Sequence, residues 1–471
     1  MLIQRKSLMR GAIRNWDPDR IKNGKLEQFK SMGAESLRLN SPRGDSLHAC
    51  YFSADKFDQE IEKMSGKIQD ISIDHPFLRG TKPIELKKDG EEPCPGIIIS
   101  SQAALDEGFQ AFCKDMKYTI LQDNSSENAQ YILVPNAYNQ APEKSVDGWT
   151  VEEAGIYDGA FEIFNPQYLQ GKAIVFDDPN KIDPENFILK ESQLQQITYG
   201  GETFMCDAGL AQVLGRFDRK CKGNYEFLNI KKETPDRAAL HNKTAILTTH
   251  QTGTFTATSP EIIRFLLLGV NVFSYDNAGK GLSTGRNTKT HMTDAILRSG
   301  EFLKRNKGFQ ESDLIFKGVC AGGLPTSEAA KLFPESTVWV DQSPENIRDA
   351  SARLIERELP AASREAIGRE MHLSESSKRV RVTAALTSLF ANFHVAENLG
   401  TKRSGHSIYT IGTEDYLVSK ESSGRIKSTL EAGPNGHYLS MPDGGHLDSW
   451  WNWGDMARGI EGILRGPEND S

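Results

Sequence analysis

A cysteine stands inside a run of small residues, GVCAGG at 318–323, directly after a candidate strand. The glycines two positions before Cys320 and two and three positions after it allow a turn from strand to helix that is too sharp for larger side chains. Such a turn would present the thiol at the carboxyl end of the strand, with the next backbone N–H facing a developing oxyanion. The run therefore predicts a nucleophilic cysteine, with the backbone of Ala321 as one oxyanion donor.

A thiol nucleophile of this kind requires a histidine base and a carboxylate that orients the imidazole. Asp415 follows the apolar run SIYTIG, and His446 follows the run YLSM. Both residues come after a candidate strand downstream of Cys320, in the order nucleophile, acid, histidine. We therefore expect these three residues to form a catalytic triad.

Other residues compete for these roles. Asp341 ends the run STVWVD, and from a neighbouring strand end it could also reach the histidine, although Asp415 is the preferred acid. His406 and His437 precede their strands and would lie at the wrong edge of the sheet. His250 ends a strand, but it begins the loop in which we expect the second oxyanion donor.

That loop is HQTG at 250–253, after the candidate strand TAILTTH. Gly253 permits a backbone turn that can aim an N–H group at the oxyanion, so Gln251 or Thr252 would act together with Ala321. An ordinary turn at the end of a strand is the alternative interpretation.

The elements that must position these residues occupy the second half of the chain. From residue 236 onward, short apolar runs alternate with helical patterns, which predicts a mostly parallel sheet of at least five strands with helices on both faces. Residues 343–405 lie between two of these strands and predict a helical lid. Its apolar stripe would either contact an acyl chain or pack on the sheet edge, and consists of Leu386, Leu389, Phe390 and Phe393.

Residues 1–235 are more irregular and more polar, and we assign no chemistry to them. The segment 35–53 alternates around a Ser-Pro-Arg-Gly-Asp turn and predicts an antiparallel hairpin. We expect an α+β region over 1–235 that supplies the first antiparallel strands of the sheet, and a catalytic domain over 236–466.

In these motifs the chain resembles the α/β-hydrolase superfamily. The residues that carry the resemblance are HQTG, NVFSYDNAGKGLSTG, GVCAGG, GTEDYLV and GGH, all in family order over about 200 residues. The pattern Asp-x-x-Gly-x-Gly-x-Ser in the second motif is the most telling. Cysteine in place of the usual serine is similar to dienelactone hydrolases and to the Gly-x-Cys-x-Gly-Gly box of polyhydroxyalkanoate synthases. A lineage that lost activity, or a serine replaced by design, would leave the same sequence.

Composition excludes other classes of protein. Lys and Arg number 56 against 64 Asp and Glu, so the net charge of −8 has the wrong sign for a nucleic-acid partner. The six cysteines form no zinc-type spacing, and no metal or organic cofactor is expected. No apolar stretch reaches the roughly 20 residues of a membrane span, and the first residues lack a Sec-type signal. We expect a cytoplasmic protein, with delivery into another cell by a non-Sec system as the alternative.

These observations together predict an acyl hydrolase that cleaves a carboxylic ester or thioester of a small-molecule or acylated substrate through an acyl-cysteine. An acyltransferase that uses the same acyl-cysteine, and a non-catalytic binding protein with this fold, remain as alternatives. A peptidase is a weaker alternative, because nothing in the sequence indicates recognition of a peptide backbone. The sequence leaves the oligomeric state open.

Overall fold

The structure is a computed structural model of the chain. It describes residues 30, 33–41, 44–74, 77, 83–88, 94–115, 118–123, 130–136, 149–153, 170–178, 194–199, 202–206, 210–211, 214, 229–249, 254–286, 288–346, 393–401, 403–441, 444–446 and 454–465.

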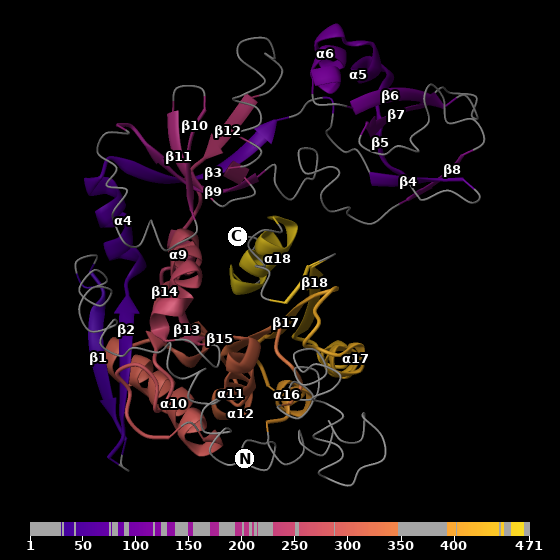
Figure 1. The fold of residues 1–471 in the computed structure, drawn as a ribbon. Coiled ribbons are helices and arrows are strands. Elements are labelled where there is room, and N and C mark those ends of the chain that lie inside the picture. Colours follow the sequence, from indigo (N-terminus) through magenta and orange to yellow (C-terminus); the bar gives the residue numbers. More distant parts are fainter. Residues whose placement is uncertain are drawn as a thin grey trace, which may run out of the picture.

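An eight-stranded sheet forms the centre of the second half of the chain (Figure 1). Six neighbouring strands are parallel, and a hairpin from the N-terminal region adds two antiparallel strands at one edge. In sheet order the strands are β1 (Glu35–Asn40), β2 (Ser46–Phe52), β14 (Asn271–Tyr275), β13 (Thr244–Thr248), β15 (Leu314–Val319), β16 (Thr337–Asp341), β17 (Ser407–Gly412) and β18 (Gly436–Met441).

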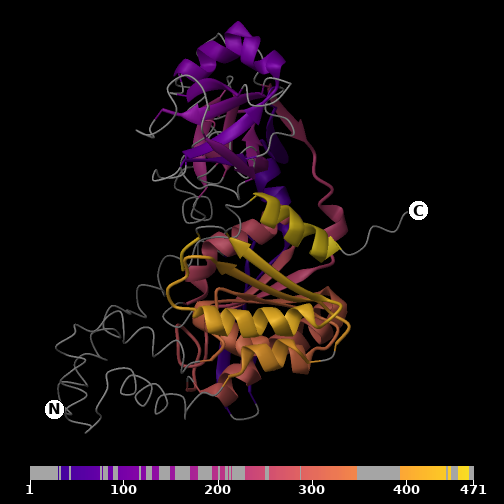
Figure 2. The ribbon, with the colours of Figure 1, turned by 90° about the vertical axis from the view of Figure 1, so that its right-hand side faces the viewer.

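Helices cover both faces of this sheet, which is why its parallel strands read as continuous apolar runs. One face packs on α9 (Ser259–Leu268) and α18 (Gly454–Arg465). Figure 2 shows α18 and α17 on opposite sides of the last two strands. The helices of the other face are α10 (Lys289–Phe302), α11 (Gly323–Ser327), α12 (Ala329–Leu332), α16 (Val395–Leu399) and α17 (Lys420–Glu431). None of the helices that the structure describes is long and apolar enough to cross a bilayer.

The strand order confirms the predicted fold class. Numbered along the chain, the strands of the sheet follow the order 1-2-4-3-5-6-7-8, and the second strand runs opposite to the other seven. Together with the sharp turn after the fifth strand, this is the α/β-hydrolase architecture. Most of the predicted lid, residues 347–392 with Leu386, Leu389 and Phe390, lies outside the described residues, whereas Phe393 is buried.

The N-terminal region contains two further sheets, both antiparallel and five-stranded. The first has the order β10 (Gln195–Tyr199), β11 (Glu202–Cys206), β9 (Gln170–Phe176), β3 (Gly66–Asp74) and β12 (Asn229–Glu233). The second has the order β6 (Tyr118–Asp123), β7 (Gln130–Pro135), β5 (Cys94–Ile99), β4 (Pro83–Lys87) and β8 (Thr150–Glu153). The helices of this region are α4 (Ala54–Lys63), α5 (Ser101–Leu105) and α6 (Glu107–Asp115).

The first N-terminal sheet shares its core with the central unit. Ile174 and Phe176 of β9 belong to the same buried apolar cluster as Phe57 of α4 and Phe265 of α9. Figure 1 accordingly shows this sheet on the side of the central sheet that carries α9 and α18. The opposite face of β9, through Val175, packs with α5, α6 and the second N-terminal sheet.

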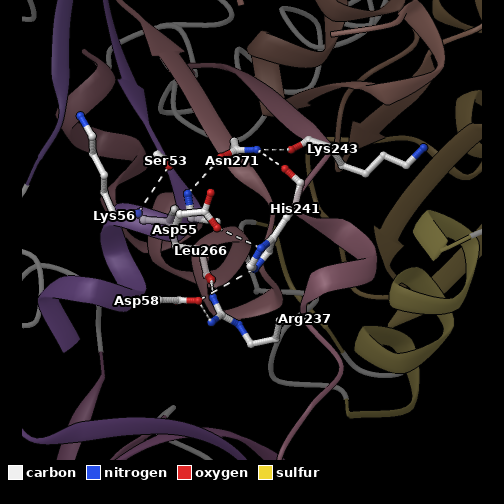
Figure 3. Close-up of polar contacts among 10 residues, drawn as sticks. Ser53, Asp55, Lys56, Asp58, Arg237, His241, Lys243, Leu266 and Asn271 are labelled. Carbon is white, nitrogen blue, oxygen red and sulfur yellow. Dashed lines mark hydrogen bonds and ion pairs between the residues drawn. The ribbon is translucent and has the colours of Figure 1, made fainter. Parts of the chain in front are cut away.

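Polar contacts fix α4 to the central unit (Figure 3). Arg237 forms an ion pair with Asp58 of α4 and donates hydrogen bonds to the carbonyl oxygens of Leu266 and Leu267 at the end of α9. A cation at the carboxyl end of a helix also interacts favourably with the negative end of the helix dipole. At the start of β14, Asn271 accepts from the backbone N–H of Ala54 at 3.0 Å and donates to two backbone carbonyls.

Candidate active site

The turn after β15 has the geometry that the small residues require. Cys320 adopts a φ of 54°, in the left-handed region that non-glycine residues rarely occupy, which is a sign of stored backbone strain. A Cβ at position 318 would lie 2.3 Å from Thr326 Oγ1, and one at position 322 would lie 2.6 Å from the carbonyl oxygen of Thr248. Only glycine fits at either position, so these two glycines make the turn possible.

The structure brings the three predicted triad residues together at the carboxyl ends of β15, β17 and β18. His446 Nε2 lies 3.2 Å from Cys320 Sγ, and His446 Nδ1 lies 2.9 Å from Asp415 Oδ2. The side chains of His446 and Asp415 are only 2% and 1% exposed. A thiol, an imidazole and a carboxylate therefore form one continuous hydrogen-bonded chain that is largely shielded from water.

Backbone groups hold the carboxylate in place. Asp415 Oδ1 accepts hydrogen bonds from the backbone N–H groups of Leu417 at 2.8 Å and Val418 at 3.1 Å. Its other oxygen is directed at the imidazole. This arrangement fixes the carboxylate and, through it, the orientation of the ring of His446.

The loop that carries His446 has an anchor that the sequence analysis missed. Gln342, directly after β16, has a φ of 47° and donates from Nε2 to the carbonyl oxygen of Gly445 at 3.2 Å. Its own backbone N–H donates to Thr410 at 2.8 Å, and the residue is fully buried. Its position immediately after a strand was the only signal in the sequence. The ring of Tyr416 contacts His446 edge to face, with the centroids 5.5 Å apart.

The surroundings of His446 favour its protonated form. Burial alone lowers the pKa of the imidazole, but hydrogen bonds and charge interactions with Asp415 and Cys320 outweigh it and raise the pKa to about 9. Other described thiols differ in setting, because burial raises the pKa of Cys50 to about 12 and that of Cys94 to about 11. Cys320 differs from them in its hydrogen bond to His446.

Asp341, the alternative acid for the triad, pairs with a lysine and not with His446 in the structure. Asp341 Oδ2 lies 2.9 Å from Nζ of the buried Lys317, and its Oδ1 accepts from Thr410 Oγ1 at 2.6 Å. Lys317 also pairs with Glu261 at 2.7 Å. Burial lowers the pKa of Lys317, yet the two carboxylates outweigh it and raise that pKa, which favours a charged ammonium inside the core. Asp341 therefore belongs to a buried ion-pair network beneath the turn.

The rival histidines lie at the other edge of the sheet. His406 precedes β17 and His437 is near the start of β18, and their ring nitrogens Nδ1 and Nε2 are 3.0 Å apart. They contact each other and not Cys320.

The predicted oxyanion donors are only partly described. Ala321 directly follows Cys320 in the turn. His250, Gln251 and Thr252 lie outside the described residues, which include Thr249 before them and Thr254 after them. Nothing in the described part of the chain groups three or more His, Cys, Asp or Glu side chains as metal ligands.

No protein-family model matches the sequence, and no curated protein matches it either. Solved structures are similar to this chain at low identity. The Pyrococcus furiosus esterase Pf2001 is 20% identical, with a TM-score of 0.38, over 48% of this chain and 81% of that one. The α/β hydrolase GrgF from Penicillium sp. sh18 is 15% identical, with a TM-score of 0.35, over 47% of this chain and 89% of that one. The enol-lactonase from Burkholderia xenovorans LB400 is 15% identical, with a TM-score of 0.33, over 48% of this chain and 92% of that one. The α/β-hydrolase fold of the core follows from its own strand order and its turn at Cys320.

Proposed function

We propose that this protein is an acyl hydrolase that cleaves a carboxylic ester or thioester through an acyl-cysteine on Cys320. The observation that carries the proposal is the chain from Cys320 Sγ through His446 to Asp415, at 3.2 and 2.9 Å, on a turn with a strained nucleophile. Nucleophile, base and orienting carboxylate within hydrogen-bond reach are the arrangement that covalent acyl transfer requires.

The first half of the reaction forms the acyl-enzyme. His446 takes the proton of Cys320, which gives the imidazolium that the raised pKa of His446 favours, and the thiolate attacks the carbonyl carbon of the substrate. The backbone N–H of Ala321 and one from Gln251 or Thr252 stabilise the oxyanion. The tetrahedral intermediate then collapses: the bond to the leaving alcohol or thiol breaks, and His446 returns the proton to that group.

The second half releases the acid. Water enters, His446 removes its proton, and the hydroxide attacks the thioester carbon of the acyl-enzyme. Collapse of this second intermediate breaks the C–S bond, releases the carboxylic acid and returns Cys320 to the thiol. Asp415 holds the imidazole in one tautomer throughout and stabilises the imidazolium that forms. No step requires a metal or an organic cofactor.

Intact-mass measurement tests the proposal. The protein and Cys320→Ala are incubated in parallel with p-nitrophenyl esters and acyl-thioesters of several chain lengths, and release of the leaving group is followed at the same time. We expect the wild type alone to gain an acyl mass or to turn over, and the preferred ester then narrows the substrate.

The same experiment separates the alternatives. An acyl adduct that persists in water and clears only with an added amine, alcohol or thiol indicates an acyltransferase. If neither protein reacts, and iodoacetamide labels Cys320 no faster than the other cysteines, the proposal is wrong and a binding function moves to first place.

A further inference from the structure

The residue directly after β16 contacts the loop that carries the proposed base. Gln342 Nε2 donates to the carbonyl oxygen of Gly445 at 3.2 Å, one residue before His446. The backbone N–H of Glu414, after β17, donates to the carbonyl oxygen of Gly444 at 2.9 Å. Two consecutive carbonyl groups of this loop are therefore held from two strand ends, one by a side chain and one by the backbone.

The next residue along the chain contacts the nucleophile turn. A Cβ at Gly323 would lie 2.5 Å from the Cβ of Ser343, so the start of α11 packs directly on this serine. The hydroxyl of Tyr409, on β17, donates to the carbonyl oxygen of Ser343 at 2.6 Å, and both residues are fully buried. The two residues that follow Asp341 therefore link the nucleophile turn to the loop before His446.

The backbone of Gln342 is held in an unfavourable conformation. Its φ of 47° lies in the left-handed region, which residues with a long side chain rarely adopt. Its N–H donates to the carbonyl oxygen of Thr410 at 2.8 Å, and the preceding Asp341 is fixed by Lys317 at 2.9 Å. Glycine would adopt this φ without strain, so a fully buried glutamine at this position points to a use for its side chain.

We propose that Gln342 is a positioning residue for His446, and that its hydrogen bond to Gly445 keeps the imidazole within reach of Cys320. The inference rests on the proposed acyl transfer at Cys320. Two glycines precede His446, and their backbone is free to adopt more conformations than that of other residues. Proton transfer requires the imidazole within hydrogen-bond distance of the thiol, and a displacement of about 1 Å lowers the rate about 10²-fold.

Two substitutions separate the hydrogen bond of Gln342 from its backbone strain. Gln342→Met keeps the length of the side chain but removes the donor, and the strain at φ 47° remains. Gln342→Gly removes the donor and also relieves the strain. If the hydrogen bond positions the base, both variants lose activity, although they differ in strain. Gln342→Gly also decides the question if Gln342→Met is too unstable to fold.

The chain offers a matched control for each substitution. Ser65 has a φ of 58° directly after the C-cap of α4, so Ser65→Gly relieves a similar strain in the N-terminal region. Asn271 is a buried asparagine that donates to the backbone carbonyl oxygens of His241 and Lys243 (Figure 3). Asn271→Leu therefore removes a buried amide donor at the opposite edge of the sheet from His446.

The experiment compares the full-length wild type with these four variants by three measurements. Steady-state kinetics with the best ester give kcat and KM. The rate of iodoacetamide alkylation at Cys320, followed from pH 6 to pH 10, reports without a substrate how well the imidazole assists the thiol. The melting temperature shows that each variant is folded and reports any general loss of stability.

For Gln342→Met and Gln342→Gly we expect a kcat about 10- to 100-fold lower, with KM within about threefold of the wild type. Alkylation of Cys320 at pH 6 should be about tenfold slower, because a thiol without a close imidazolium is mostly protonated there. At pH 10 the rates should converge, since ordinary thiols ionise there unaided. Ser65→Gly and Asn271→Leu should keep the wild-type kinetics and pH profile, even where Asn271→Leu lowers the melting temperature.

Three results would overturn the inference: a wild-type alkylation profile in both Gln342 variants, a wild-type profile in Gln342→Gly alone, or an equal change in Asn271→Leu. Failure of the proposed function has a different signature, namely a wild type in which Cys320 alkylates no faster than the other cysteines at pH 6. If the wild type alkylates selectively at Cys320 but turns over none of the esters, the alkylation profile alone decides whether Gln342 positions His446.

Discussion

Two hydrogen-bonded relays in this molecule have the same connectivity. In the first, Cys320 Sγ lies 3.2 Å from His446 Nε2, and His446 Nδ1 lies 2.9 Å from Asp415. In the second, Ser36 Oγ lies 3.2 Å from His48 Nε2, and His48 Nδ1 lies 3.2 Å from Asp276. Each carboxylate also accepts two backbone N–H groups. A search of the structure for a hydroxyl or thiol, a histidine and a carboxylate within hydrogen-bond distance of one another would find both.

The two relays differ in how the backbone presents the hydroxyl or thiol. Cys320 has a strained φ of 54° and is the first residue of the short helical turn Cys320–Gly322. Ser36 lies within the regular antiparallel pair of β1 and β2, opposite Cys50. A strand residue of this kind has no following turn to supply an oxyanion donor. The comparison shows that the backbone around the nucleophile decides which relay is a candidate active site. The same relay in a regular strand has a structural role, because it connects strands and loops of the fold.

Replacing each histidine gives the largest expected contrast. His446→Gln removes the base, and we expect kcat/KM for the best ester to fall by about 10³-fold, within the range that general-base catalysis contributes. His48→Gln keeps a group that can hydrogen-bond to Asp276, so its loss should be about tenfold or less. Steady-state kinetics at one pH check both values.

Melting temperatures serve as the control for this contrast. His48→Gln should lower the melting temperature, because His48 joins the hairpin to the motif at Asp276. Equal losses of kcat/KM in the two variants would contradict the assignment of the base.

The carboxylates give the next contrast. Asp415→Asn keeps the shape of the side chain but removes the charge that stabilises the imidazolium, and we expect kcat/KM to fall about 10²-fold or more. Asp341→Asn instead breaks the buried pair with Lys317, at a cost of about 3 kcal/mol or more in the free energy of unfolding. Urea unfolding and kinetics on both variants separate the two roles, and a larger kinetic loss in Asp341→Asn would reassign the acid.

The parallel half of the fold could be predicted because its strands are buried on both faces. The run SIYTIG was expected at 407–412 and forms β17 with those bounds. The candidate residues at 320, 415 and 446 were found for the same reason, since each follows such a run. Positions at strand ends converge in a parallel sheet, so sequence order alone was enough to place them near one another.

The antiparallel sheets of the N-terminal region could not be predicted in the same way. Strands such as β3 (GKIQDISID) and β12 (NIKKE) carry many polar residues, and they pair with each other across a long stretch of chain. Their patterns are therefore compatible with loops until the partner is known. Gln342 was missed for a related reason, because the loop that it contacts at Gly445 comes from another part of the sequence.

The pH dependence of stability distinguishes the first relay by its charge. Asp415 and Cys320 raise the pKa of His446 to about 9, above its ordinary value of 6.5. A raised pKa stabilises the folded state fully below 6.5, and this stabilisation is lost as the pH rises through about 9. We expect the wild type to be more stable than Asp415→Asn at pH 6, and we expect this stability difference to shrink as the pH rises through about 9. Urea unfolding across this window checks it, and a constant difference would argue against the charged pair.

The smallest expected effect comes from the nucleophile position of the second relay. Ser36→Ala removes a hydroxyl that contacts His48, and the loss of this hydrogen bond should cost about 1 kcal/mol. Turnover and the alkylation of Cys320 should remain at wild-type values, because Ser36 has no turn behind it to stabilise an oxyanion. A fluorophosphonate probe, which reacts with activated serines, should leave Ser36 unlabelled in the wild type. Labelling of Ser36 would mean that a histidine and a carboxylate are enough to activate a hydroxyl in a regular strand. The strained turn at Cys320 would then not be the feature that distinguishes the two relays.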